Sequence, residues 1–317
     1  MTATHPTLTS VRVRVERVHT DGTYTRVTCL RGGPGPAFVL VPGIGMGVGI
    51  FERLAPRLLP HGDVFALDLP GFAGIRTHDR ALSIADYARL VDAALEHLHL
   101  DDPVVIGHSM GTQVVTELAA SRPGLSRIVL ISPVVAPQQR APLRVVGAFL
   151  LAALHEPIGV TLLAGVSYVL TGLRSFAATL PRMLAYRMED RIADVDADTL
   201  IVRGEYDTIS PRSWIDTLVR RAPTASAREV SRAAHSVMHG HAEAVARLCV
   251  VHAGAEEAVD PPPVGAGRWT LRLSAYALAA RLREITAILR GDDTALERAK
   301  TSRVRVALAA GDVEPAT

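Results

Sequence analysis

The sequence predicts an α/β fold in which a mostly parallel β-sheet is covered by helices on both faces. Short apolar runs alternate along the chain with amphipathic stretches that are long enough for helices. Parallel sheets produce this pattern because their strands are buried on both faces and are joined by helical crossovers. The chain has 317 residues, 48% of them hydrophobic, so it can bury such a core without disulfide bridges.

An antiparallel hairpin is expected before the parallel strands. Residues 11–18 alternate valine with charged residues, which is the period-2 pattern of a half-exposed strand. Asp21-Gly22 supplies a turn, and residues 24–30 provide the partner strand. A stretch rich in glycine and proline, 32–36, ends this hairpin.

The parallel strands and their helices follow in alternation. Ser83, with Asp86 three residues later, has the spacing of a helix N-cap. Buried strands are expected at 38–41, 63–67, 104–106, 128–131, 200–202 and 227–230. Helices are expected at 50–59, 83–100, 110–120, 212–221 and 240–251.

Two segments depart from this alternation and divide the chain. One is aliphatic, lacks a strand pattern and interrupts the sheet, as a helical cap (a lid over a site) would. The other follows a run of three prolines and begins with an amphipathic, arginine-rich stretch at 269–290. We therefore expect a core of residues 1–136 and 191–255, a helical cap at 137–190, a linker at 256–267 and a C-terminal helical extension at 268–317.

The composition argues against several classes of protein. A net charge of +2 gives no concentrated basic face for nucleic acid. The two cysteines, Cys29 and Cys249, do not form a disulfide framework, which favours a reducing compartment. The first residues lack the apolar core of a secretory signal, and His155, Glu156 and Pro157 interrupt the longest apolar stretch. We expect a cytoplasmic protein without a transmembrane helix, and the oligomeric state stays open.

The strongest chemical signal is the pentapeptide Gly107-His108-Ser109-Met110-Gly111. It directly follows a predicted strand and precedes a predicted helix, which is the context that a G-x-S-x-G nucleophile motif requires. The turn leaves Ser109 at its apex in a strained backbone conformation, and the glycines keep Cβ atoms out of the turn. The helix N-terminus then directs free amides toward negative charge that forms near Ser109. For an isolated match, an ordinary helix N-cap would be the alternative.

A serine nucleophile needs a base and an acid, and both have candidates in the required chain order. Asp207 lies on the loop after the predicted strand 200–202, and His235 follows the last predicted strand. Both loops belong to the carboxyl edge of the sheet, where open α/β sheets bind ligands. His239 and His241 are rivals of His235, but we expect them to be exposed near the start of the next helix.

Other side chains near these motifs have simpler explanations. His108 adjoins the nucleophile and is expected to be structural. Asp68 ends a strand, and a turn formed with Pro70-Gly71 explains it. The alternative for Asp207 is a cap on the helix that starts near Pro211.

Five segments occur together in one order: VLVPGIG (39–45), DLPGFAG (68–74), GHSMGTQ (107–113), RGEYD (203–207) and AAHS (233–236). With them, the chain resembles the α/β-hydrolase superfamily over residues 10–255, in the capped branch of esterases, lipases, thioesterases and carbon–carbon bond hydrolases. The resemblance implies a catalytic triad of Ser109, Asp207 and His235. It also implies an oxyanion hole formed by the backbone amides of Ile44 and Met110.

The sequence departs from the family pattern at a few positions. Pro42 stands before Gly43 where a histidine is common, Thr112 replaces a common glycine, and Ala234 replaces the glycine before His235. The first two changes remove no backbone donor, so we expect the oxyanion hole to survive. A serine nucleophile in place of aspartate argues against the haloalkane dehalogenase and epoxide hydrolase branches.

The motifs predict a serine hydrolase that cleaves an ester, thioester or related acyl bond of an apolar small molecule through an acyl-enzyme on Ser109. No metal or organic cofactor is required. Carbon–carbon bond hydrolysis by the same triad is one alternative, and ligand binding without catalysis on the same fold is another.

The cap and the C-terminal extension leave alternatives open. The aliphatic run 145–173 could line an apolar pocket or form helix core. The cap arginines are expected to keep their charged ends in solvent, although one facing the site would favour anionic substrates: Arg174, Arg182, Arg187 and Arg191. For the C-terminal helix we favour docking on the domain with solvated arginines over contact with a membrane surface or a partner.

Overall fold

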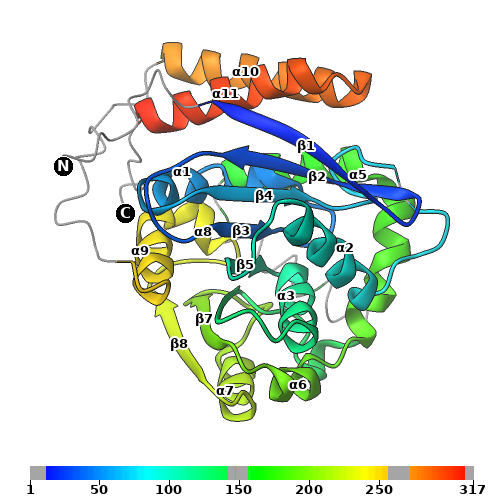
Figure 1. The fold of residues 1–317 in the computed structure, drawn as a ribbon, viewed down its shortest axis with the longest axis vertical. Helices are drawn as coiled ribbons and strands as arrows, with labels where there is room; N and C mark the ends of the chain where they lie inside the picture. The colour runs from blue at the N-terminus through cyan, green and yellow to red at the C-terminus, as the bar shows by residue number, and fades with distance from the viewer. Residues whose placement is uncertain are drawn as a thin grey trace.

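The computed structural model describes residues 12–76, 78–141, 147, 156, 158–255 and 271–310. An eight-stranded sheet with the strand order β1-β2-β4-β3-β5-β6-β7-β8 runs through its centre (Figure 1). The strands are β1 (Val13–Thr20), β2 (Thr23–Leu30), β3 (Phe38–Val41), β4 (Val64–Asp68), β5 (Val104–His108), β6 (Arg127–Ile131), β7 (Asp198–Gly204) and β8 (Ala225–Val230).

Helices lie between these strands and after them. The α-helices are α1 (Leu54–Leu58), α2 (Ile84–His97), α3 (Met110–Ser121), α5 (Ile158–Ala185), α6 (Met188–Arg191), α7 (Arg212–Arg221), α8 (Val237–Gly240), α9 (Ala242–His252), α10 (Leu271–Arg290) and α11 (Asp293–Ala310). Short 3-10 helices are η1 (Val48–Phe51), η2 (Leu59–His61), η3 (Pro137–Gln139) and η4 (Ile192–Asp194).

The sheet is mixed only at its N-terminal edge. Strands β1 and β2 form the expected hairpin, with Asp21 at φ 51° and Gly22 at φ 77° in its turn, and β2 pairs antiparallel with β4. All later pairs, from β3/β4 to β7/β8, are parallel. The predicted fold class, a mostly parallel sheet between helices, is confirmed.

Both faces of the sheet are buried, as the continuous apolar strands predict. Val39 and Leu40 are adjacent in β3 and therefore point to opposite faces. Val39 belongs to one core cluster with Val115 of α3, and Leu40 belongs to another with Leu54 of α1 and Val250 of α9. The two clusters fix the helices on either side of the strand ends that carry the predicted site.

Two helices that we expected as single segments are interrupted. The stretch 50–59 forms η1, α1 and η2 in succession, and Pro60 lacks the N–H that a continued helix would need. The stretch 240–251 is divided into α8 and α9 at His241, whose backbone is not helical (φ −125°, ψ 47°). The N-cap of α2 is confirmed, since Asp86 N donates to Ser83 Oγ at 3.1 Å.

The segment expected as a cap is helical where the structure describes it. It comprises η3, α5 and α6, and it is inserted between β6 and β7. Gly172, at φ 74°, interrupts the helical backbone of α5 and kinks the helix. The rest of this segment (142–146, 148–155 and 157) lies outside the described residues.

Helices α10 and α11 form a C-terminal hairpin that lies along β1 (Figure 1). Val13 N donates to Thr301 Oγ1 at 3.1 Å, and Val15 N donates to Glu297 Oε1 at 2.8 Å. The expected C-terminal helical extension is present as two helices: α10 matches the predicted amphipathic stretch, and α11 continues the extension. The predicted linker at 256–267 lies outside the described residues.

Candidate active site

Ser109 lies in the tight turn between β5 and α3. Its backbone has φ 55° and ψ −122°, outside the regions that L-residues ordinarily adopt. Such a conformation costs on the order of 1–3 kcal/mol and persists only where the surroundings enforce it. Here Ser109 N donates to Ile131 O of β6 at 3.0 Å, and Thr112 Oγ1 donates to Ser109 O at 2.6 Å. The predicted strain at the motif serine is therefore present.

The glycines of the motif are needed because backbone passes close to them. A Cβ atom at Gly107 would overlap the carbonyl oxygen of Gly111, and one at Gly111 would overlap that of Val41. Any side chain at either position would move β5, α3 or β3 apart. The turn that presents Ser109 thus depends on both glycines.

The loop after β3 lies against the serine. A Cβ atom at Gly43 would lie 2.9 Å from Ser109 Cβ, so only glycine allows this approach. Ile44 follows directly and is buried, and Met110 is the first residue of α3. Both residues whose amides are expected to form the oxyanion hole therefore lie near Ser109. Met110 follows it directly in the chain, and Ile44 follows Gly43, which packs against Ser109. Their role as donors stays a prediction.

Asp207 and His235 form a buried pair. His235 Nδ1 lies 3.0 Å from Asp207 Oδ2 and 3.1 Å from Oδ1. Asp207 Oδ1 also accepts from Ile209 N and Ser210 N, each at 3.0 Å, which fixes the carboxylate on its loop. Of the three histidines considered as the base, His235 is the one that lies against this carboxylate.

The pairing lowers the pKa of Asp207 and raises the pKa of His235, so it favours the charged form of each side chain. Burial alone would raise the pKa of Asp207, but the charge of His235 and its hydrogen bond lower it below the ordinary value. Burial alone would lower the pKa of His235, but the charge of Asp207 and the same hydrogen bond raise it. Asp207 is therefore ionised at neutral pH, and His235 donates its Nδ1 proton to it.

This geometry agrees with what the comparison with known proteins shows. Residues 38–248, about two thirds of the chain, match the model of the alpha/beta hydrolase family. The chain belongs to the α/β-hydrolase family. The matched range begins at β3 and ends within α9, so it includes Ser109, Asp207 and His235 and excludes α10 and α11.

Individual relatives cover different shares of the chain. N-formylmaleamate deformylase of Pseudomonas putida is 37% identical over 35% of this chain and 42% of its own length, so the chain spans less than half of that relative. A pimeloyl-[acyl-carrier protein] methyl ester esterase of Xanthomonas campestris is 24% identical over 68% of this chain and 93% of its own. A solved 2-hydroxy-6-oxo-6-phenylhexa-2,4-dienoate hydrolase of a Rhodococcus strain superposes with a TM-score of 0.64 at 17% identity, covering 76% of this chain and 99% of its own. At that identity the superposition shows the fold alone.

In this hydrolase-family site, His108 and Ser132 hold the backbone of His235. Ser132 Oγ donates to His235 O at 2.8 Å, and His108 Nε2 lies 3.3 Å from the same oxygen. Burial, together with the nearby charge of His235, lowers the pKa of His108 to about 3. His108 is therefore neutral near pH 7 and serves as a structural donor, as the sequence predicted. The contribution of Ser132 was not foreseen.

Two sequence expectations about neighbouring side chains are wrong. His239 is buried rather than exposed, and its Nε2 lies 3.2 Å from Glu52 Oε1. Asp68 does not serve a surface turn, because its Oδ2 accepts from buried Arg26 Nε at 2.9 Å and its Oδ1 accepts from Val48 N at 2.7 Å. Burial alone would raise the pKa of Asp68, but the charges of Arg26 and Lys300 lower it. No sequence pattern predicts ion-pair and hydrogen-bond partners this far apart in the chain.

Glu156 is a further charged group beside the base. Its Oε1 accepts from Ser236 N, the residue after His235, at 2.7 Å. Burial raises the pKa of Glu156, and its negative charge contributes to the raised pKa of His235. The only sequence signal was an acidic residue inside an otherwise aliphatic run.

Helix α5 lies against the loop that carries Ile44. Thr171 Oγ1 donates to Gly45 O at 2.9 Å, and a side chain at Gly45 would collide with the ring of Tyr168. The buried side of α5 includes a row of hydroxyl residues four apart, more polar than the aliphatic lining we expected: Ser167, Thr171, Ser175 and Thr179. A cap over the site and a lining role for it stay predictions.

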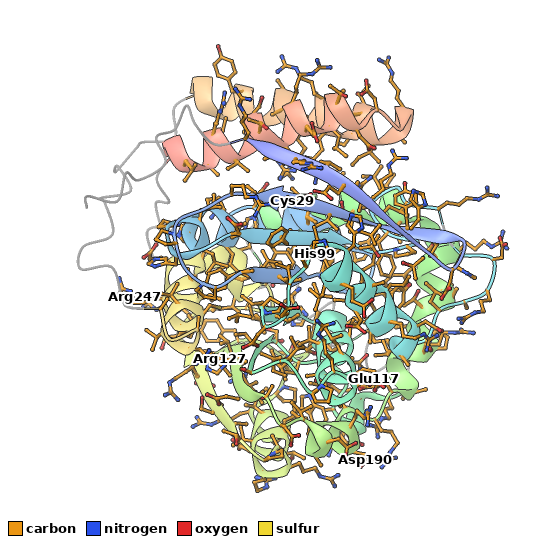
Figure 2. The ribbon with its side chains drawn as sticks, viewed as in Figure 1. Cys29, His99, Glu117, Arg127, Asp190 and Arg247 are labelled. Carbon is orange, nitrogen blue, oxygen red and sulfur yellow. The ribbon has the colours of Figure 1, made fainter. Side chains whose placement is uncertain are left out.

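The cap arginines lie at the protein surface with polar partners. Arg187 pairs with Asp190, and Arg191 Nε donates to Glu117 Oε2 at 3.0 Å. Figure 2 labels Glu117 on α3 and Asp190 on α6. Arg182 Nη1 donates to Ala178 O of its own helix, and Arg174 is exposed. The solvent-facing orientation that we expected for these arginines agrees with these contacts.

Among the residues that the structure describes, no helix is both long enough and apolar enough to cross a membrane.

Proposed function

We propose that the protein is a serine hydrolase that cleaves an ester, thioester or related acyl bond of an apolar small molecule. The observation that carries the proposal is the strained conformation of Ser109, which lies against the loop at Gly43. It is supported by His235, which a buried carboxylate orients. A helix N-cap does not require φ 55°, and the side chain of this serine accepts no cap hydrogen bond from the amides of α3. The strain presents Oγ for reaction.

The Asp207–His235 pair determines which nitrogen acts as the base. Since Nδ1 carries the proton that Asp207 accepts, Nε2 has the lone pair that removes the proton from Ser109 Oγ. Oγ then attacks the acyl carbon, and the amides of Ile44 and Met110 stabilise the oxyanion. His235 gives its proton to the leaving group, and the acyl-enzyme remains on Ser109.

Deacylation repeats these steps with water. His235 removes a proton from water, the hydroxide attacks the acyl carbon, and Ser109 leaves with the proton that His235 returns. His108, with its pKa near 3, does not compete for these protons. Every step uses the chain's own residues.

The known relatives support acyl chemistry without naming the substrate. One of the two relatives described above is a deformylase and the other is a methyl ester esterase. Carbon–carbon bond hydrolysis remains the alternative reaction for the same triad, and the Rhodococcus hydrolase has the same fold. A ligand-binding protein on this fold is the non-catalytic alternative.

Two measurements test the proposal. A fluorophosphonate probe should label the protein at Ser109, because only an activated serine reacts, and absence of labelling would favour the binding protein. A series of p-nitrophenyl esters should then show activity that rises with acyl length and falls once the pocket is full, each methylene adding up to roughly 0.8 kcal/mol. Equal activity at all lengths, or a preference for acetyl, would contradict an apolar acyl pocket.

A further inference from the structure

Helix α10 has apolar residues on its outer side as well as on its buried side, where Ala280 and Ala287 pack. Arg281 and Glu284 also face inward, whereas Leu278, Leu282 and Leu289 are 61%, 56% and 73% exposed. A helix that packs only on its own domain places apolar residues inward and charged ones outward. The sequence of α10 therefore provides for a second contact on its outer side.

Ion pairs fix the inner side of α10, so a rotation of the helix cannot bury its exposed leucines. Arg281 Nη2 donates to both carboxylate oxygens of Glu52, at 3.0 and 2.8 Å. Glu284 lies between Arg303 and Lys300 of α11, with Lys300 Nζ at 3.4 Å. Turning the leucines inward would leave these buried charges without partners, which is strongly unfavourable.

The outer side combines an apolar stripe with flanking cations. Leu278, Leu282 and Leu289 fall within about 40° of one another around the helix axis. The exposed Arg283 and Arg290 lie about 100° beyond Leu282 and Leu289, on one flank of the stripe. Between 276 and 290, all of which the structure describes, Glu284 is the sole acidic residue and it faces inward.

We propose that the outer side of α10 binds the surface of a membrane that contains anionic lipids. The leucines would enter the interface between headgroups and acyl chains, and Arg283 and Arg290 would contact lipid phosphates. The helix would lie in the plane of the membrane. This interaction is separate from the proposed hydrolysis at Ser109, and α10 lies outside the range that matches the hydrolase family.

A second copy of the chain suits this surface less well. A twofold contact through α10 would bring Arg283 and Arg290 of both copies to one interface. The described part of α10 offers no outward carboxylate to receive them. An anionic lipid surface supplies the missing negative charge.

Vesicle sedimentation tests the proposal on the full chain. Vesicles of phosphatidylcholine with phosphatidylglycerol should bind the protein, and vesicles of phosphatidylcholine alone should bind it much more weakly. Replacing Leu282→Glu together with Leu289→Glu should reduce binding more than roughly tenfold. Replacing Arg283→Gln or Arg290→Gln should reduce it about fivefold each, the factor that corresponds to about 1 kcal/mol.

A matched control separates the surface from a general effect of new charge. Val251 of α9 is 60% exposed, so Val251→Glu introduces the same group elsewhere and should leave binding unchanged. All variants should keep the wild-type circular dichroism and p-nitrophenyl esterase rate in solution. Failure of the esterase assay alone would concern Ser109 and not this surface.

Three results would overturn the proposal. The first is equal binding of both vesicle types or of neither. The second is binding that persists in the Leu282→Glu, Leu289→Glu variant. The third is sedimentation-equilibrium evidence that the wild type is a dimer and that this variant is a monomer, which would make a second copy the occupant.

Discussion

The site around Ser109 and the C-terminal hairpin both contain buried charges, but they use them differently. At the site, a carboxylate–imidazole pair, Asp207 with His235, packs against His108, the residue before the strained serine. At the hairpin, ion pairs join α10 and α11 to Glu52 after η1 and to Asp68 of β4, and Glu284 of α10 joins the two helices to each other. The first arrangement suits proton transfer, and the second suits attachment. Changes in the two regions should therefore affect different measurements.

The largest expected effect is on turnover. Ser109→Ala should lower kcat/KM for a p-nitrophenyl ester at least roughly 10⁴-fold, because no acyl-enzyme can form. The melting temperature should not fall, since Ser109 Oγ is not needed to cap α3. A purified variant that keeps a substantial share of the wild-type rate would show that Ser109 is not the nucleophile.

Replacing the predicted acid, Asp207, should reduce turnover nearly as much as replacing Ser109. Asp207→Asn keeps the size of the side chain but no longer holds the Nδ1–H tautomer of His235, so kcat should fall by roughly 10⁴. Glu205→Gln is the matched control on the same loop, because Glu205 accepts from Arg232 N at the surface. Equal rates for the two variants would remove Asp207 from the triad.

Substitutions in the C-terminal hairpin should lower the free energy of unfolding. Lys300→Met leaves Asp68 and Glu284 with one cation fewer in a buried setting, which should cost about 3–5 kcal/mol in the free energy of unfolding. Arg17→Met breaks the half-exposed pair with Asp293 at the other end of α11 and should cost at most about 1 kcal/mol. Urea unfolding measures both losses. A loss for Lys300→Met no larger than that for Arg17→Met would mean that the buried ion pairs contribute little to the stability of the hairpin on the domain.

The smallest effect should be a shift in pH dependence. The charge of Glu156 helps to raise the pKa of His235, so Glu156→Gln should lower that pKa. Because unprotonated His235 is the base, the acid limb of the kcat/KM profile should move to lower pH. Asp190→Asn removes an equal charge at the surface and should leave the limb in place. An unchanged or opposite shift in Glu156→Gln would remove Glu156 from the electrostatics of the base.

Sequence patterns predicted what local physics determines. The apolar runs that became β3 to β7 need only burial on both faces, and the turn at Ser109 depends on the glycines of the motif, Gly107 and Gly111. The chain order of serine, aspartate and histidine can also be read from the sequence without any distance between them. His235 could thus be paired with Asp207 from their positions after predicted strands.

What the sequence did not predict depends on contacts between distant segments. Asp68 was assigned to a turn because Arg26 and Lys300 lie 42 residues before and 232 residues after it. The bounds of α11 within the predicted helical extension were not given, because Glu297, Lys300 and Thr301 face inward, where an amphipathic pattern requires apolar residues. His239 was expected at the surface because nothing near it in sequence reveals Glu52.

The contact between β1 and α11 constrains how the chain folds during synthesis. The N–H groups of Val13 and Val15 find their acceptors on Thr301 and Glu297, which the ribosome adds 288 and 282 residues later. Until then, β1 is the outer strand of a nearly finished sheet with donors still open to any neighbouring chain. Nascent chains of this protein should consequently depend on chaperones for longer than those of a hydrolase whose edge strand needs no late helix to cover it.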